Sequence, residues 1–102
     1  MTLWTKVNAL LAGIPDSKAR IDIASTINLL YGLFVRGEVS EDQLRSDLVE
    51  ICETVIEAAN PLLPREEARA RAEAVADDLI RTMKVEGVEY RVRSRLRRLL
   101  SP

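Results

Sequence analysis

The chain has 102 residues, of which 47% are hydrophobic and 30% are charged. This length and balance are typical of one globular domain and exclude an intrinsically disordered chain. No apolar run approaches the ~20 residues that a membrane-spanning helix needs, and the N-terminus lacks the basic region that begins a signal peptide. We therefore expect a single domain over residues 1–102, located in the cytoplasm and without a membrane partner.

The chain contains no histidine, and Cys52 is its one cysteine. This composition excludes Ser-His-Asp and Cys-His catalysis, histidine-based zinc sites and an internal disulfide. Cys52 falls in the middle of an apolar helical face, which indicates a buried core residue rather than a nucleophile. We therefore expect a protein that is not an enzyme and that holds no cofactor.

Hydrophobic spacing at helical period predicts a compact all-α bundle of four to five helices, with antiparallel neighbours and short loops. Thr2 can begin a first helix, which Gly13 and Pro15 would end. The stretch from Ile21 to Val35 is apolar on one wide face and partly apolar on the other. A helix of this kind usually has neighbours on more than one side, so we expect it to be the central helix.

The third helix has the clearest start signal in the sequence. Ser40 and Gln43 fit a capping box, and Val39 and Leu44 fit the hydrophobic staple that often accompanies it. The apolar face that follows extends to Ala59, with Cys52 at its centre. This pattern predicts a helix that buries one side over its full length.

Two prolines, Pro61 and Pro64, separate the third helix from a fourth, which we expect to run from Pro64 to about Lys84. Residues 85–93 then alternate as a strand does, but residues 91–100 also fit a helix. Because a lone strand would have no partner in the chain, we favour a short fifth helix that begins after Gly87. Its apolar stripe would comprise Val88, Val92, Leu96 and Leu99.

Charge is unevenly distributed along the chain, whose net charge is −1. Residues 1–90 carry 10 basic and 16 acidic side chains, whereas residues 91–102 carry five arginines and no acid. The five residues are Arg91, Arg93, Arg95, Arg97 and Arg98. We therefore divide the domain into an acidic bundle, residues 1–87, and a basic C-terminal segment, residues 88–102.

Five guanidinium groups within eight residues suit contacts to phosphate. Alternatively, they could stabilise the C-terminal end of a helix and pair with the acidic bundle or with a second copy of it. Arginine outnumbers lysine 12 to 3, which is compatible with a thermophilic source.

A group of carboxylates lies on the third and fourth helices. It comprises Glu50, Glu53, Glu57, Glu73, Asp77 and Asp78. Within it, the stretch Glu50-Ile51-Cys52-Glu53 resembles the Glu-x-x-Glu motif of the MazG-like, all-α nucleoside triphosphate pyrophosphatases. The resemblance implies an Mg²⁺ ion held between two antiparallel helices.

The second motif of that family, Glu-x-x-Asp, is not matched in this chain. Glu73 and Asp77 are four residues apart, and Ala74 stands three residues before Asp77. The carboxylates also project opposite the apolar face of their helix. We therefore interpret them as a solvated acidic face and predict no metal site.

Some apolar residues exceed what one four-helix core can accommodate. Trp4, Leu29 and Leu33 are our candidates for self-association, and Leu62, Leu63 and Leu100 are also left over. Apolar and aromatic side chains of this kind supply the buried anchors of protein interfaces.

These observations favour a non-catalytic protein–protein interaction or assembly module that forms a homo-oligomer. The alternative is a nucleic-acid-binding protein, or a subunit of a ribonucleoprotein complex, that uses the C-terminal arginines. A third alternative is an Mg²⁺-dependent enzyme similar to the all-α nucleoside triphosphate pyrophosphatases.

Overall fold

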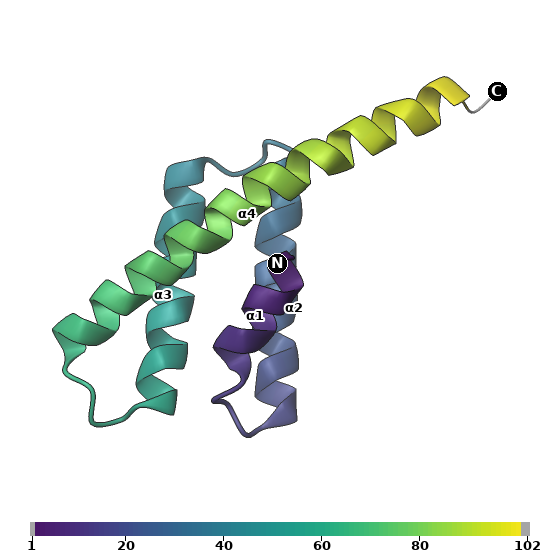
Figure 1. Ribbon diagram of the computed structural model, residues 1–102. Helices are drawn as coiled ribbons and strands as arrows, with labels where there is room; N and C mark the ends of the chain where they lie inside the picture. Colours follow the sequence, from purple (N-terminus) through teal and green to yellow (C-terminus); the bar gives the residue numbers. More distant parts are fainter. Residues whose placement is uncertain (1, 101–102) are drawn as a thin grey trace.

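The computed structural model describes residues 2–100, and every regular element in that range is a helix. The helices are α1 (Leu3–Leu11), α2 (Ser17–Val35), α3 (Glu41–Ala59) and α4 (Arg65–Leu100). Helices α1, α2 and α3 run alternately down and up, whereas α4 crosses them obliquely and continues beyond them on one side (Figure 1). The expected all-helical fold is confirmed, with four helices rather than five. None of these helices is long and apolar enough to cross a membrane.

Each of the first three helices begins after a capping residue, and two of these residues, Thr2 and Ser40, were predicted from the sequence. The side chains of Thr2, Asp16 and Ser40 each accept a backbone N–H from the first turn of α1, α2 and α3. The capping box at α3 is only half formed, because Gln43 Nε2 donates to Asp47 Oδ1 (2.9 Å) instead of turning back to Ser40. Local capping therefore determines where these helices start.

The packing of α3 on α4 makes the largest helix–helix interface of the molecule. The part of α4 next to the α3–α4 loop presents alanines, whose small side chains let the two helices approach closely. The buried apolar side chains of these two helices are Leu44, Leu48, Val49, Cys52, Val55, Ile56, Ala68, Ala72, Ala76, Leu79, Ile80 and Met83. Each large side chain buried here contributes roughly 1.5–3 kcal/mol.

Helix α2 is not the central helix that its sequence indicated. Only Ile27 is buried among its residues, whereas α3 and α4 contribute most of the core. The wide apolar face of α2 contacts both α3 and α4, but each contact is small compared with the α3–α4 interface. The width of that face therefore reflects two partial neighbours, not a central position.

Helix α4 continues without interruption through residues 84–88, where the sequence predicted a break. Gly87 is buried in mid-helix, and a Cβ atom there would lie 3.3 Å from Val35 Cγ2. Glycine in a helix costs about 1 kcal/mol relative to alanine. Here the missing side chain lets the end of α2 pack closely against α4. The prediction of a separate fifth helix was wrong, while the preference for helix over strand in this region is confirmed.

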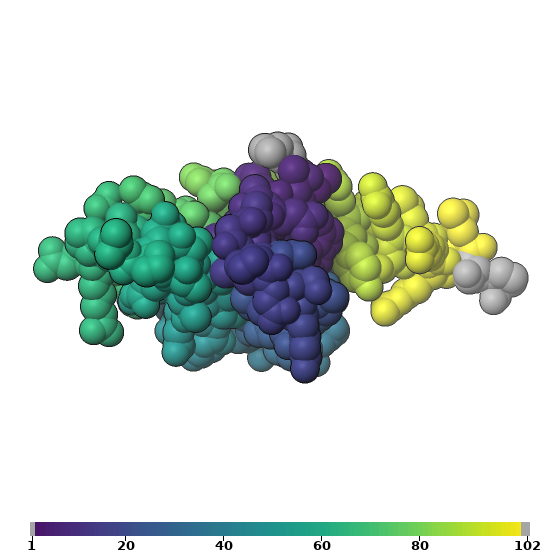
Figure 2. Space-filling view, turned by 90° about the horizontal axis from the view of Figure 1, so that it is seen from below, coloured from purple at the N-terminus to yellow at the C-terminus, as the bar shows by residue number. Residues whose placement is uncertain are grey.

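The long helix makes the molecule elongated rather than compact. Its principal extents are 58 × 28 × 22 Å, and its radius of gyration is 15.3 Å. A compact domain of this size would have a radius of gyration of about 13 Å. Residues 92–100, which we call the arm, extend from one side of the body formed by residues 2–91 (Figure 2).

Gly87 provides a direct test of the close contact between α2 and α4. We expect Gly87→Leu to lower the free energy of unfolding by about 1–3 kcal/mol, because the added side chain overpacks the site. Urea unfolding followed by circular dichroism measures this change. Ala74→Leu, on an exposed part of the same helix, is the matched control and should cost little. Equal stability of the two variants would contradict the close approach.

Cys52 is fully buried, as the sequence indicated, and burial raises the pKa of its thiol to about 11 from 9.0. The unfolded chain can therefore ionise this thiol at a pH where the folded chain cannot. Stability should be unaffected by Cys52 below about pH 9 and should fall as the pH rises toward 11. Thermal unfolding of the protein and of Cys52→Ala over this pH range tests the effect. The variant should show a shallower decline, and parallel declines would contradict the raised pKa.

Candidate functional site

Two charged side chains of α4 hold the ends of other helices just before the arm begins. Glu86 Oε1 accepts the backbone N–H of Leu3 (2.8 Å) at the start of α1. Arg91 donates from Nε (3.2 Å) and Nη2 (2.8 Å) to the carbonyl oxygen of Val35 at the end of α2. An acid at a helix N-terminus and a base at a C-terminus satisfy unpaired backbone groups and the helix dipole. These contacts fix α4 in place up to residue 91.

The arm presents an apolar stripe on the side of α4 that faces away from the packed core. Val92 and Leu96 are each 52% exposed, and Leu99 is 79% exposed. The stripe follows i, i+3 and i+4 spacing, and helical geometry places it opposite the buried Met83 and Gly87. We call it the outer stripe; it begins in the body at Val85 and Val88 and continues along the arm at Val92, Leu96 and Leu99.

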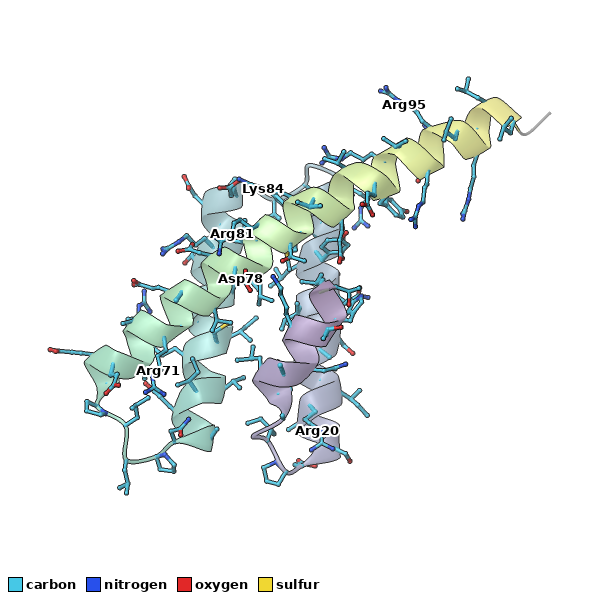
Figure 3. All side chains as sticks on the ribbon, viewed as in Figure 1. Arg20, Arg71, Asp78, Arg81, Lys84 and Arg95 are labelled. Carbon is cyan, nitrogen blue, oxygen red and sulfur yellow. The ribbon has the colours of Figure 1, made fainter. Side chains whose placement is uncertain are left out.

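The five predicted arginines do not act as one cluster, because Arg91 is engaged with α2. Helical geometry places Arg93 and Arg97 on one flank of the outer stripe and Arg95 and Arg98 on the other. None of these four forms an ion pair with a residue between 2 and 100. Arg95, labelled beside the arm in Figure 3, lines a hollow with Arg98 and with Val35 and Arg36 at the end of α2. The arm is therefore amphipathic, with basic flanks that the body does not neutralise.

A groove with a volume of about 420 Å³ lies between α2 and α3. Its apolar lining consists of Ile23, Leu30, Ile51 and Val55, and its polar lining of Thr26, Asp47, Glu50 and Thr54. Both threonine hydroxyls donate to backbone carbonyls of their own helices, at 2.9 and 3.0 Å. The two carboxylates are therefore the polar groups that remain available to a ligand.

Sequence reasoning missed this groove. Ile23 and Leu30 belong to the wide face of α2, and Ile51 belongs to the apolar face of α3, so all three were interpreted as core. The structure leaves each of them half-buried. The signal in the sequence was the width of these faces, which exceeds what one neighbouring helix covers.

The three candidates for self-association lie at different depths of the surface. Trp4 is 37% exposed, Leu29 is 61% exposed and Leu33 is half-buried. Trp4 lines a hollow with Tyr31 and Tyr90, and Leu29 lines a second hollow that also contains both tyrosines. Trp4 and Leu29 therefore flank the place where α1, α2 and α4 meet, and their role in association stays a prediction.

The acidic group of α3 and α4 is divided among ion pairs. Arg69 pairs with Glu53 (2.8 Å), and Arg45 pairs with Asp77 (2.8 Å) and holds the pKa of that carboxyl below its usual value. Glu50 instead lines the groove between α2 and α3. Among the residues that the structure describes, no three acidic, histidine or cysteine side chains are grouped to hold a metal ion.

A further charged hollow lies between α1 and α4. Lys6 Nζ contacts Asp78 Oδ1 (3.0 Å) and Thr82 Oγ1 (2.9 Å), and Arg81 also pairs with Asp78 (3.3 Å). Lys6 and Arg81 hold the pKa of the Asp78 carboxyl below its usual value, Lys6 having the larger effect. The charges at this place neutralise one another and join α1 to α4, which the sequence did not indicate.

No protein-family model, curated protein or solved structure matches the chain. What the arm and the groove can bind is therefore inferred from their own shape, polarity and charge.

We predict that Mg²⁺ and Mn²⁺ leave the melting temperature unchanged, because Glu53 and Asp77 are already paired with arginines. Thermal unfolding with and without each ion, alongside an assay of nucleoside triphosphate hydrolysis, tests this prediction. A metal-dependent rise in melting temperature that disappears in both Glu50→Gln and Asp77→Asn would instead support the enzyme alternative.

Proposed function

We propose that the protein is a non-catalytic assembly module that binds another protein chain through the arm of α4 and forms a homo-oligomer. The observation that carries this proposal is the outer stripe, which remains exposed where α4 leaves the body. Apolar side chains repeated along one face of a helix are the usual anchors when a helix packs on a partner. The described chain places no helix of its own over them.

The absence of usable catalytic groups supports a binding role. The chain has no histidine, and its one thiol is buried with a raised pKa. Four carboxylates of the acidic group are engaged by Arg69, Arg45 and Lys6, namely Glu53, Glu73, Asp77 and Asp78. What the surface offers is apolar area and charge, which serve recognition rather than bond chemistry.

Nucleic-acid binding is the second candidate, and it is favoured by the four arginines of the arm, which form no ion pair with any residue that the structure describes. Three features weigh toward a protein partner. The arginines are split onto two flanks with apolar residues between them, and Tyr90, the aromatic residue nearest to them, lies before the arm begins. The body is acidic and repels phosphate at long range.

Substitutions on the stripe and on one flank separate these two candidates. We expect Leu96→Gln with Leu99→Gln to weaken self-association by roughly 100-fold or more, because each buried leucine contributes about 1.5–3 kcal/mol. Arg93→Gln with Arg97→Gln should leave association nearly unchanged. Sedimentation velocity over a micromolar concentration series measures both, and thermal unfolding should show that both variants remain folded.

The opposite pattern would support nucleic-acid binding. In that case the unchanged protein would be monomeric and would bind duplex DNA or single-stranded RNA. Its affinity would fall steeply with salt, and the arginine variant would lose about 0.9 of the logarithmic slope for each phosphate contact removed on duplex DNA.

A further inference from the structure

We infer that the arm of one copy of this chain lies in the groove between α2 and α3 of a second copy, so that two copies exchange their arms. This inference rests on the proposed function and names both the partner and the surface that receives the arm. Shape, charge and the direction of α4 each support it independently.

The polarity of the two surfaces matches. The outer stripe offers valine and leucine side chains that are more than half exposed. The groove offers Ile23, Leu30 and Ile51, which are half-buried, in a volume of about 420 Å³. Because the threonine hydroxyls beside them are bonded to their own helices, an apolar side chain can enter without leaving those groups unpaired.

The charges match in both sign and spacing. Asp47 and Glu50 stand one helical turn apart on α3, and Arg95 and Arg98 stand one turn apart on one flank of the arm. Three residues of helix span ~4.5 Å, so both arginines can face both carboxylates in one register. Asp47 accepts one hydrogen bond, from Gln43, and neither it nor Glu50 forms an ion pair with a residue between 2 and 100.

The direction of α4 makes the partner a second copy rather than the same chain. Glu86 and Arg91 attach α4 to α1 and α2 immediately before the arm. From there the unbroken helix leads the arm away from the body (Figures 1 and 2). The arm could reach the groove of its own chain only if α4 broke and released these contacts. Reciprocal exchange between two copies fills both grooves and closes the assembly as a dimer.

Reversal of the charges on each side tests the pairing. One variant, Arg95→Glu with Arg98→Glu, reverses the charge on this flank of the arm. The other, Asp47→Arg with Glu50→Arg, reverses the charge at the rim of the groove. We expect each variant alone to dissociate at least tenfold more readily than the unchanged protein. Mixed in equal amounts, they should form a heterodimer, because the reversed arm then meets the reversed groove and the unchanged arm meets the unchanged groove. Sedimentation velocity and native mass spectrometry measure this recovery.

The matched control reverses the other flank of the arm. Arg93→Glu with Arg97→Glu carries the same charge change and should keep its own dimers, but it should form little heterodimer with the groove variant, whose reversed groove repels Arg95 and Arg98. As much heterodimer with this control as with the Arg95 and Arg98 variant would overturn the assigned pairing. Melting curves of each variant establish that it is folded.

A cross-link supplies a second measurement that does not depend on charge reversal. Chains with Thr54→Cys are mixed with chains with Leu99→Cys under mild oxidation, while buried Cys52 stays unreactive. We expect a disulfide between chains for this pair and none when Ala70→Cys, on an exposed part of α4, replaces Thr54→Cys. Equal cross-linking of both pairs would overturn the assignment of the arm to this groove.

The outcomes separate this inference from the proposed function. If Leu96→Gln with Leu99→Gln dissociates the protein but reversal of the groove charges does not, the arm binds another protein surface. In that case only the assignment to the groove is wrong. If the unchanged protein is monomeric and the arm binds duplex DNA or anionic vesicles, both the arm–groove pairing and the protein–protein function are wrong.

Discussion

Gly87 lies where the end of α2 packs against α4, which runs unbroken from Arg65 to Leu100. The other helices depend on that continuity. α3 packs along the first part of α4, Glu86 holds the start of α1, and Arg91 holds the end of α2. These two capping residues lie little more than one turn apart, so they keep their positions only while α4 stays helical between them. The direction of the arm follows from the same constraint.

The polar groups of the molecule are satisfied unevenly. In the body, acidic and basic side chains pair across helices, as Lys84 does with Glu41 (2.6 Å) and Arg45 with Asp77 (2.8 Å). Exposed pairs of this kind are each worth about 0–1 kcal/mol, but they leave little charge free for a ligand. Within residues 2–100, the charged side chains on the flanks of the arm and at the rim of the groove form no such pairs, and the apolar side chains next to them are only partly covered. This contrast distinguishes the surfaces suited to binding from those that stabilise the fold.

The arm benefits from being an extension of α4 rather than a separate helix. An isolated helix as short as residues 92–100 is marginal in water, because the first turn is costly to form. Here that turn is supplied by the part of α4 already packed on the body. A partner therefore meets a helix whose shape and direction are set beforehand, which reduces the entropy lost on binding.

The sequence by itself determined the helical class, the capped starts at Thr2 and Ser40, the buried position of Cys52 and the basic, amphipathic character of the C-terminal segment. These features depend on residues within a turn or two of one another, or on periodicity along one helix. Tertiary structure decided the rest: whether a helix continues through Gly87, and whether Ile51 faces the core or a groove. The tertiary structure also decided which carboxylates form ion pairs with which arginines and lysines. The reason is physical, since the cost of a glycine in a helix and the burial of an apolar face are offset by contacts with residues distant in the chain.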